Sequence, residues 1–322
     1  MTIMLQRCGS LGGLVITALA LACSSPQHYP IASGPRDWSA HPAVVEIEIE
    51  SSTTIFAISD VHGGYDRMVA LFAKHHLIDV IPSAPGAIRW SGGDAVLVVT
   101  GYLIDKGAQS LEVLDALMAL EQSATDQGGR IVVTVGNHEA EFFVDPTNSK
   151  ASAFDDELIT DHMMPMAVAD GSDSHGKWLR ERPFAVRVGR WFFSHAGDTH
   201  GRSVADLEQV LRAAVNTNDY DDPEIVGVDS ILESKDWFTS DNSMGLRYAH
   251  AVGAEHIVFG HSPHSIGPDG AIATAQNGAL LRIDCGMSPA VDYSQGALLR
   301  VRPDGGQDVV EALSADGSVH GL

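Results

Sequence analysis

Residues 53–64 of this 322-residue chain read TTIFAISDVHGG, a largely apolar strand that runs directly into Asp60, His62 and two glycines. In an extended stretch, residues i and i+2 point the same way, so Asp60 and His62 can hold the same metal ion. Gly63 and Gly64 allow a tight turn into a helix. A lone Asp-x-His is weak evidence, but its place at the end of a buried strand strengthens it.

Four further polar motifs follow apolar strands in the same way. Strands predicted at 95–100, 131–135, 190–194 and 255–259 lead into GYLIDKG (101–107), GNHE (136–139), SHAG (194–197) and GHSPH (260–264). Helical spacing predicts helices at 65–76 and 110–122 between the first three strands. This β-α-β-α-β order implies a parallel sheet that binds ligands at the carboxyl ends of its strands.

The second half of the chain is less regular. We expect paired strands at 184–188 and 190–194 joined by a turn at Gly189, a helix at 204–214, and closing strands at 280–284 and 297–301. The predicted organisation is a signal peptide (1–22), a flexible tether (23–50), a main domain (51–303) and a loose, Gly/Asp-rich C-terminal tail (304–322).

The N-terminal residues are typical of an exported protein. Arg7 precedes an apolar run, 11–22, that ends in the small-x-small sequence Ala20-Leu21-Ala22, directly before Cys23. This pattern predicts a signal peptide, and it resembles a bacterial lipoprotein signal in which Cys23 is lipidated. We expect a periplasmic or lipid-anchored protein that meets the membrane only through that lipid. The alternative is a plain cleaved signal with an incidental cysteine.

The composition excludes some partners. Asp and Glu outnumber Lys and Arg by 42 to 20, a formal net charge of −22. We expect no nucleic-acid binding, which relies on Lys and Arg to neutralise phosphates. A phosphate-bearing substrate requires a local reversal of the field, which bound divalent metals supply. Cys285 has no second core cysteine, so we expect it to be a small buried residue.

The histidines that follow strands are candidates for chemistry. Asn137 offers a neutral carbonyl ligand, and His138 beside it can protonate a leaving alkoxide. Glu139 is taken as structural. His195 and His261 each end an apolar run and precede small residues, which favours metal ligation over an isolated hydrogen-bonding role. His264 stays ambiguous.

Together the five motifs resemble the calcineurin-like metallophosphoesterase superfamily over residues 53–302. Residues 60–66 (DVHGGYD) and 103–107 (LIDKG) resemble its phosphoprotein phosphatase branch, especially the Shewanella-like and diadenosine-tetraphosphatase-like members. The resemblance implies an α/β fold of two facing mixed β-sheets flanked by helices, a four-layer sandwich. It also implies two divalent metal ions, Mn, Fe or Zn, at one edge of the sheets.

The resemblance implies a role for each matching residue. Asp60 and His62 would bind the first ion, and Asn137, His195 and His261 the second. His138 would be the general acid, with Asp105 orienting its ring. Lys106 and Asn137 would contact the substrate phosphate. A further phosphate-binding arginine of the family is absent after Trp237-Phe238, and the potential substitutes are Arg67, Arg182 and Arg247.

The resemblance also implies a reaction, the hydrolysis of phosphomonoesters on small molecules or proteins by a metal-activated hydroxide. Two alternatives stay open. One is a hydrolase of dinucleoside polyphosphates or phosphodiesters. The other is an inactive pseudo-phosphatase that binds a phosphorylated small molecule or phosphoprotein without turnover.

Tyr102 departs from the family pattern, because it occupies the position of the aspartate that bridges the two ions. The substitution has three explanations: a natural loss that weakens the enzyme, a point change in this particular chain, or an altered site in which Tyr102 is itself a ligand. We favour the first two from the sequence.

Overall fold

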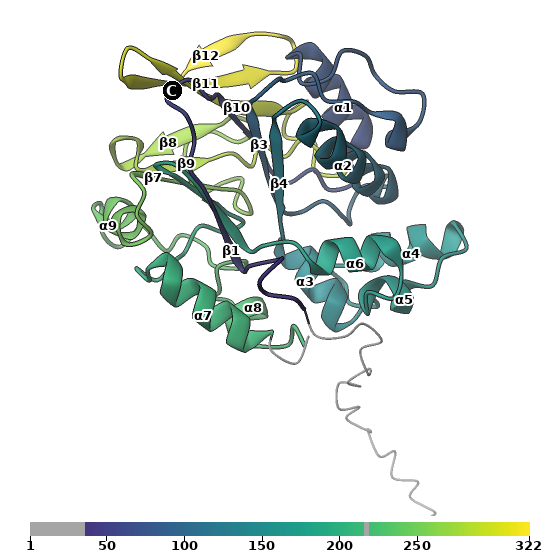
Figure 1. Cartoon of the computed structure of the whole chain (residues 1–322). Coiled ribbons are helices and arrows are strands. Elements are labelled where there is room, and N and C mark those ends of the chain that lie inside the picture. Colours follow the sequence, from purple (N-terminus) through teal and green to yellow (C-terminus); the bar gives the residue numbers. More distant parts are fainter. Residues whose placement is uncertain (1–35, 216–218) are drawn as a thin grey trace, which may run out of the picture. The chain divides into compact units, whose positions relative to one another are not determined.

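The computed structural model describes residues 36–215 and 219–322 (Figure 1). These residues form two mixed six-stranded β-sheets flanked by helices. One sheet has the order β1 (Val44–Ile47), β5 (Ala185–Val188), β6 (Trp191–Ser194), β7 (His256–Phe259), β9 (Leu280–Arg282) and β8 (Ala273–Ala275). The other has the order β12 (Val319–Gly321), β11 (Gln307–Ser314), β10 (Ala297–Asp304), β2 (Ile55–Ile58), β3 (Val96–Thr100) and β4 (Arg130–Thr134). The predicted class of two mixed sheets is confirmed.

The predicted β-α-β-α-β unit forms the centre of the second sheet. β2 pairs parallel with β3, and β3 pairs parallel with β4. Every residue of β2 and β3 is buried, as expected for parallel strands covered on both faces. β5 and β6 form the predicted antiparallel pair, with Val188 opposite Trp191 across the turn at Gly189. The carboxyl ends of these strands therefore carry the motif loops.

Helices cover the sheets and connect the strands (Figure 1). They are α1 (Tyr65–Lys74), α2 (Ser110–Thr125), α3 (Asn137–Val144), α4 (Ser152–Thr160), α5 (Pro165–Ala169), α6 (Ser174–Arg180), α7 (Val204–Ala214), α8 (Pro223–Val226) and α9 (Met244–Ala251), with short 3₁₀ turns at Pro85–Ala87 and Gln276–Gly278. α1 buries Met68, Leu71 and Phe72, the stripe that its helical spacing predicts. No helix among the described residues has the length and apolarity that crossing a bilayer requires.

Two predicted boundaries are wrong. The predicted tether contains β1, whose Val44 and Ile47 are buried and whose backbone pairs parallel with β5. Four residues are too few to show periodicity, so the pattern alone does not reveal this strand. The predicted signal peptide, Cys23 and residues 24–35 of the tether lie outside the described residues.

The C-terminal residues are also not a loose tail. β11 pairs antiparallel with β10 along its whole length, and β12 pairs with β11. Gly305 and Gly306 have φ of 60° and 92° and form a two-residue turn between Asp304 and Gln307. Two residues with positive φ are the requirement of the tight hairpin turn that matches strand twist. Gly305 and Gly306, which suggest a loose tail in the sequence, instead form the turn of a β-hairpin.

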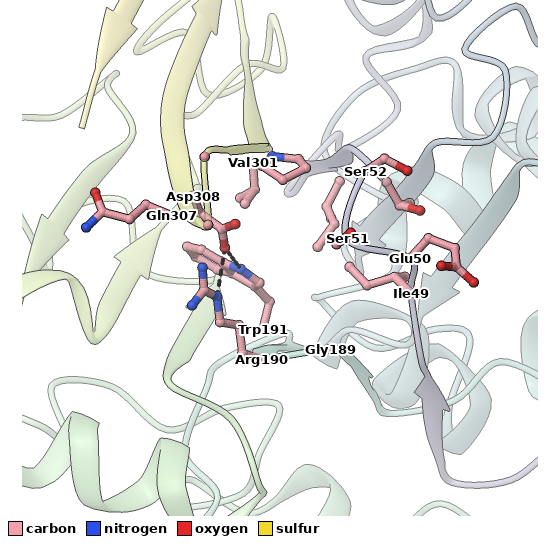
Figure 2. A pocket seen from close by; sticks show the side chains of 15 residues that line it. Ile49, Glu50, Ser51, Ser52, Gly189, Arg190, Trp191, Val301, Gln307 and Asp308 are labelled. Carbon is pink, nitrogen blue, oxygen red and sulfur yellow. Dashed lines mark hydrogen bonds and ion pairs between the residues drawn. The ribbon is translucent and has the colours of Figure 1, made fainter.

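A cavity of about 830 Å³ lies at the amino ends of β2 and β6, the opposite ends of these strands from the motif loops (Figure 2). Asp308 of β11 connects the two sheets there. Its Oδ2 accepts hydrogen bonds from Arg190 Nε at 2.9 Å and Trp191 Nε1 at 2.8 Å. Burial raises the pKa of Asp308, but the bonds from Arg190 and Trp191 outweigh it and lower the pKa below 3.8.

Asp308→Ala should lower the free energy of unfolding at neutral pH by about 1–3 kcal/mol, because the buried Trp191 indole N–H and the partly exposed Arg190 guanidinium lose their acceptor. The folded-state pKa of Asp308 is lowered, so its contribution is present above pH 3.8 and is lost as the pH falls through the folded value. Urea unfolding of wild type and variant should therefore converge in acid. The exposed Asp304→Ala is the control. An Asp308→Ala difference that persists unchanged in strong acid contradicts the ion-pair explanation.

Candidate active site

The five motifs meet at the carboxyl ends of the strands. Asp60 follows β2, Tyr102 follows β3, and Asn137 begins α3 after β4. His195 follows β6 and His261 follows β7 in the other sheet. No more than 6% of any of these five residues is exposed. Elements of both sheets thus bring buried polar side chains to the edge where sheets of this type bind ligands.

The backbone of these loops is strained. Asp60, His62, Tyr102, Asp105 and His261 have φ between 46° and 68°, a region that non-glycine residues adopt at an energetic cost. Hydrogen bonds between the loops maintain this conformation, including His62 N–H to the Tyr102 carbonyl at 2.7 Å. Such strain persists only where the surroundings enforce it, and it concentrates at functional sites.

Glu139 enforces the conformation of the loop after β3. Its buried carboxylate accepts hydrogen bonds from the backbone N–H groups of Tyr102, Leu103, Ile104 and Gly136 at 2.7–3.2 Å. The sequence predicts a structural Glu139 but not these partners, because three of the four belong to a loop over thirty residues earlier. This carboxylate therefore helps to fix the position of residue 102, together with the hydrogen bond from His62 N–H to the Tyr102 carbonyl.

His138 and Asp105 form the predicted pair. His138 Nδ1 donates to Asp105 Oδ2 at 3.0 Å, and the backbone N–H of Ala153 at the start of α4 donates to Asp105 Oδ1 at 2.8 Å. Burial raises the pKa of Asp105, but the hydrogen bonds and the positive charge of His138 outweigh it and lower the pKa. An ionised Asp105 thus fixes the orientation of the His138 ring.

Asn137 and His195 present two lone pairs to each other. His195 Nδ1 donates to the Thr100 carbonyl at 2.8 Å, and burial lowers the pKa of His195 well below 6.5, so Nε2 carries no proton. Asn137 Nδ2 donates to Glu233 Oε1 at 2.7 Å, which turns Oδ1 toward His195 Nε2 at 3.2 Å. Two acceptors without a proton between them fit a bound cation.

His261 completes this group of donors. Its Nε2 donates to the backbone carbonyl of Glu233 at 3.1 Å. Its Nδ1 accepts from the Tyr102 hydroxyl at 2.9 Å. Glu233 thereby orients both Asn137 and His261, the kind of outer-shell support that metal ligands require. These residues fit the second of the two ions that the resemblance implies.

The Tyr102 ring lies beside Asp60 and His62, the residues that the resemblance assigns to the first ion. Its centroid lies 4.2 Å from the rings of His62 and His195 and 4.3 Å from that of His138. Asp60 Oδ1 and His62 Nε2 are 4.0 Å apart. Among the described residues, no group of three His, Cys, Asp or Glu side chains is arranged to hold a metal ion. The Tyr102 ring therefore lies against both His62 and His195, where the resemblance implies a bridging carboxylate.

Glu233 and Asp284 are site residues that the sequence does not reveal. Asp284 follows β9 at the same edge, and burial raises its pKa. Burial also raises the pKa of Asp60, and the negative charge of Asp284 adds to the shift. The place of Asp284 at the end of a predicted strand is the signal that could have identified it. Glu233 lies on an irregular loop, where the sequence offers no signal.

Of the predicted phosphate-binding cations, only Lys106 lies at the site. It is exposed, and its Nζ lies 3.5 Å from His62 Nε2. The three arginines form ion pairs elsewhere, Arg67 with Asp292, Arg182 with Glu121 and Arg247 with Asp241. Lys150, which the sequence does not single out, contacts Glu141 and Glu233 beside Asn137.

His264 and Cys285 take no part in this group. His264 is exposed and its Nδ1 lies 2.8 Å from Asp269 Oδ1. Cys285 is buried, and burial raises the pKa of its thiol to about 11. A thiol held neutral in this way is a poor nucleophile, as its isolation in the sequence predicts.

Glu139→Ala should lower the free energy of unfolding by at least about 3 kcal/mol, because each buried N–H left without an acceptor costs about 1–3 kcal/mol. Urea unfolding measures the change, with exposed Glu50→Ala as the control. A loss below about 1 kcal/mol would show that the loop holds residue 102 without this carboxylate.

Several curated proteins are similar to parts of this chain. Shewanella-like protein phosphatase 2 of Arabidopsis thaliana is 31% identical over 105 residues, 33% of this chain and 25% of that protein. Shewanella-like protein phosphatase 1 of Plasmodium berghei is 22% identical over 262 residues, 75% of this chain and 69% of that protein. The symmetrical bis(5'-nucleosyl)-tetraphosphatase of Escherichia coli O1:K1 is 26% identical over 149 residues, 45% of this chain and 43% of that protein. The chain thus spans about a quarter of the first of these relatives.

Solved structures share the fold. A cold-active protein-tyrosine phosphatase of a psychrophilic Shewanella species superposes with a TM-score of 0.65 at 20% identity over 87% of this chain and 82% of that one. A protein serine/threonine phosphatase from Saccharomyces cerevisiae, described as similar to human PP5, has a TM-score of 0.59 at 16% identity over 85% and 84%. The profile of calcineurin-like phosphoesterases matches residues 53–265, a stretch that contains all five motifs. This chain therefore belongs to the calcineurin-like phosphoesterase family.

Proposed function

We propose that this protein is a metal-dependent phosphatase that hydrolyses phosphomonoesters, and that Tyr102 keeps its activity low. The observation that carries the proposal is the hydrogen-bonded His138–Asp105 pair, which lies beside donors that face each other without a proton between them. Structural hydrogen bonding alone does not require unpaired acceptors to meet in a buried site. A cation-binding hydrolytic site does.

Each side chain has a task in the proposed reaction. Asn137, His195 and His261 would hold one ion, while Asp60 and His62 border the other position. Divalent ions bound there supply a water of lowered pKa and stabilise negative charge on the phosphate. Because Nδ1 of His138 is held by Asp105, the proton for the departing oxygen comes from Nε2.

Lys106 supports a small, exposed phosphoryl group as the substrate. It is exposed at the site, and its Nζ lies 5.4 Å from the centroid of the Tyr102 ring. A lysine attracts phosphate as a point charge without the bidentate geometry of arginine. With the net charge of −22, these features favour phosphorylated small molecules or exposed phosphoprotein side chains over nucleic acids. We further propose that the protein acts outside the cytoplasm, through the N-terminal signal and Cys23.

Turnover of an aryl phosphate with Mn²⁺ tests this proposal. Tyr102→Asp should raise the rate by roughly tenfold or more, because a carboxylate restores the bridge between two ions. In that background, His138→Ala should lower the rate by about 10²–10⁴-fold, the usual contribution of a general acid. Exposed His250→Ala is the matched control.

Other outcomes select other functions. Absence of turnover in both wild type and Tyr102→Asp, with Mn²⁺, Fe²⁺ or Zn²⁺, would eliminate the enzyme and support a pseudo-phosphatase. Faster hydrolysis of diadenosine tetraphosphate or of a bis-aryl phosphodiester than of the aryl phosphate would support one of the other hydrolases. The match to a tetraphosphatase makes the dinucleotide the first of these to test.

A further inference from the structure

We propose that Tyr102 is itself a metal ligand, and that with Asn137, His195 and His261 it forms a single-ion site in place of a two-ion centre. The proposal rests on the proposed metal-dependent function and deepens it. What is new is the role of the Tyr102 hydroxyl, which would convert the family's two-ion site into a site for one transition-metal ion.

The potential metal-binding atoms of these four residues point toward one another. His195 Nε2 and Asn137 Oδ1 face each other, and their other polar atoms are already engaged by Thr100 and Glu233. His261 Nδ1 faces the Tyr102 hydroxyl while its Nε2 is held by Glu233. The two ring nitrogens and the amide oxygen of the set therefore present lone pairs, which is the condition for metal binding, and the Tyr102 hydroxyl presents the one proton that ligation would displace.

The distances between the potential ligand atoms also suit a single ion. Ligands about 2.0–2.1 Å from a tetrahedral ion lie about 3.3 Å from one another. The two measured separations within the set are 3.2 Å, between His195 Nε2 and Asn137 Oδ1, and 2.9 Å, between Tyr102 Oη and His261 Nδ1. Both are close to that value. The set has two nitrogen and two oxygen donors, a combination that suits iron or zinc.

Contacts with neighbouring residues hold Tyr102 with its hydroxyl directed at His261. Glu139 binds the backbone N–H of Tyr102 at 3.1 Å. The ring packs against those of His62, His138 and His195 at centroid distances of 4.2–4.3 Å. A ring enclosed on three sides keeps its hydroxyl beside His261 with little loss of entropy on binding, which is how a preorganised ligand gains affinity.

The surroundings of Asp60 and His62 favour one ion over two. The face of His62 meets carbon atoms of Tyr102, which are not ligands. Asp60 already accepts hydrogen bonds from the Ser59 hydroxyl and from the backbone N–H of His261. The arrangement therefore leaves the first position without the shared carboxylate that would bring two ions together.

The chemistry of the phenol determines the measurement. Ligation replaces the O–H bond of Tyr102 by an oxygen–metal bond, and the proton passes to solvent. A tyrosine oxygen is an established ligand of iron, as in catalase. Ferric iron bound to phenolate absorbs visible light through charge transfer from oxygen to iron, which imidazole and amide ligands do not produce. A visible band therefore reports on this one ligand.

The test uses the full chain, freed of metal with a chelator, loaded anaerobically with Fe²⁺ and then oxidised in air. Wild type should develop a visible charge-transfer band at about one iron per chain. Tyr102→Phe should lose the band while its far-ultraviolet circular dichroism is unchanged. Tyr293→Phe, which removes an exposed phenol, is the matched control and should keep the full band.

Iron-loaded wild type without a visible band, or a band that survives in Tyr102→Phe, would overturn the proposal. If Tyr102→Phe does not fold, Tyr102→His, which keeps a ring and a donor but has no phenol, gives the same reading. A band in wild type together with no phosphatase turnover in any variant would instead sink the proposed function and leave the ligand assignment standing.

Discussion

The hydrogen bonds of Glu139 are the interaction on which the rest of the site depends. This carboxylate ties the turn after β4 to the loop after β3 by accepting from four backbone N–H groups. The tie places Tyr102 beside Asn137 and maintains a left-handed backbone that residue 102 would not adopt by itself. A buried charge is tolerated here because every oxygen is hydrogen-bonded. Glu139, which has no role in the proposed reaction, accepts all four of these hydrogen bonds.

Residue 102 affects both the packing of the site and its capacity to bind cations. The family architecture converges histidine, asparagine and carboxylate donors from both sheets at one edge, a cluster that mutual repulsion and burial make unfavourable without a cation. Tyr102 reduces the cost of this cluster in the absence of a cation, because its hydroxyl donates a hydrogen bond to His261 and its ring packs against His62 and His195. The Tyr102 ring therefore leaves the site well packed, and we propose that it changes how many ions the site accepts.

The parts that the sequence predicts are those encoded locally. Apolar strands ending in polar turns predict β2, β3, β4, β6 and β7 and the residues after them, and the five motifs are sufficient to indicate the family. Glu233 and Asp284 escape prediction because their role exists only where distant strand ends meet. β1 is too short to show a period, and the C-terminal hairpin is hidden by the glycines that make its turn. The geometry of Tyr102 also changes the weighting of the three explanations for its presence, since only the structure shows its hydroxyl directed at His261.

We propose that residue 102 sets the number of metal ions that this site binds. The most direct measurement is the metal content of wild type and Tyr102→Asp, purified and loaded with Mn²⁺ side by side and counted by elemental mass spectrometry. Wild type should bind about one ion per chain and Tyr102→Asp about two, because a shared carboxylate can bridge two ions. Equal ion counts in the two proteins would contradict this proposal.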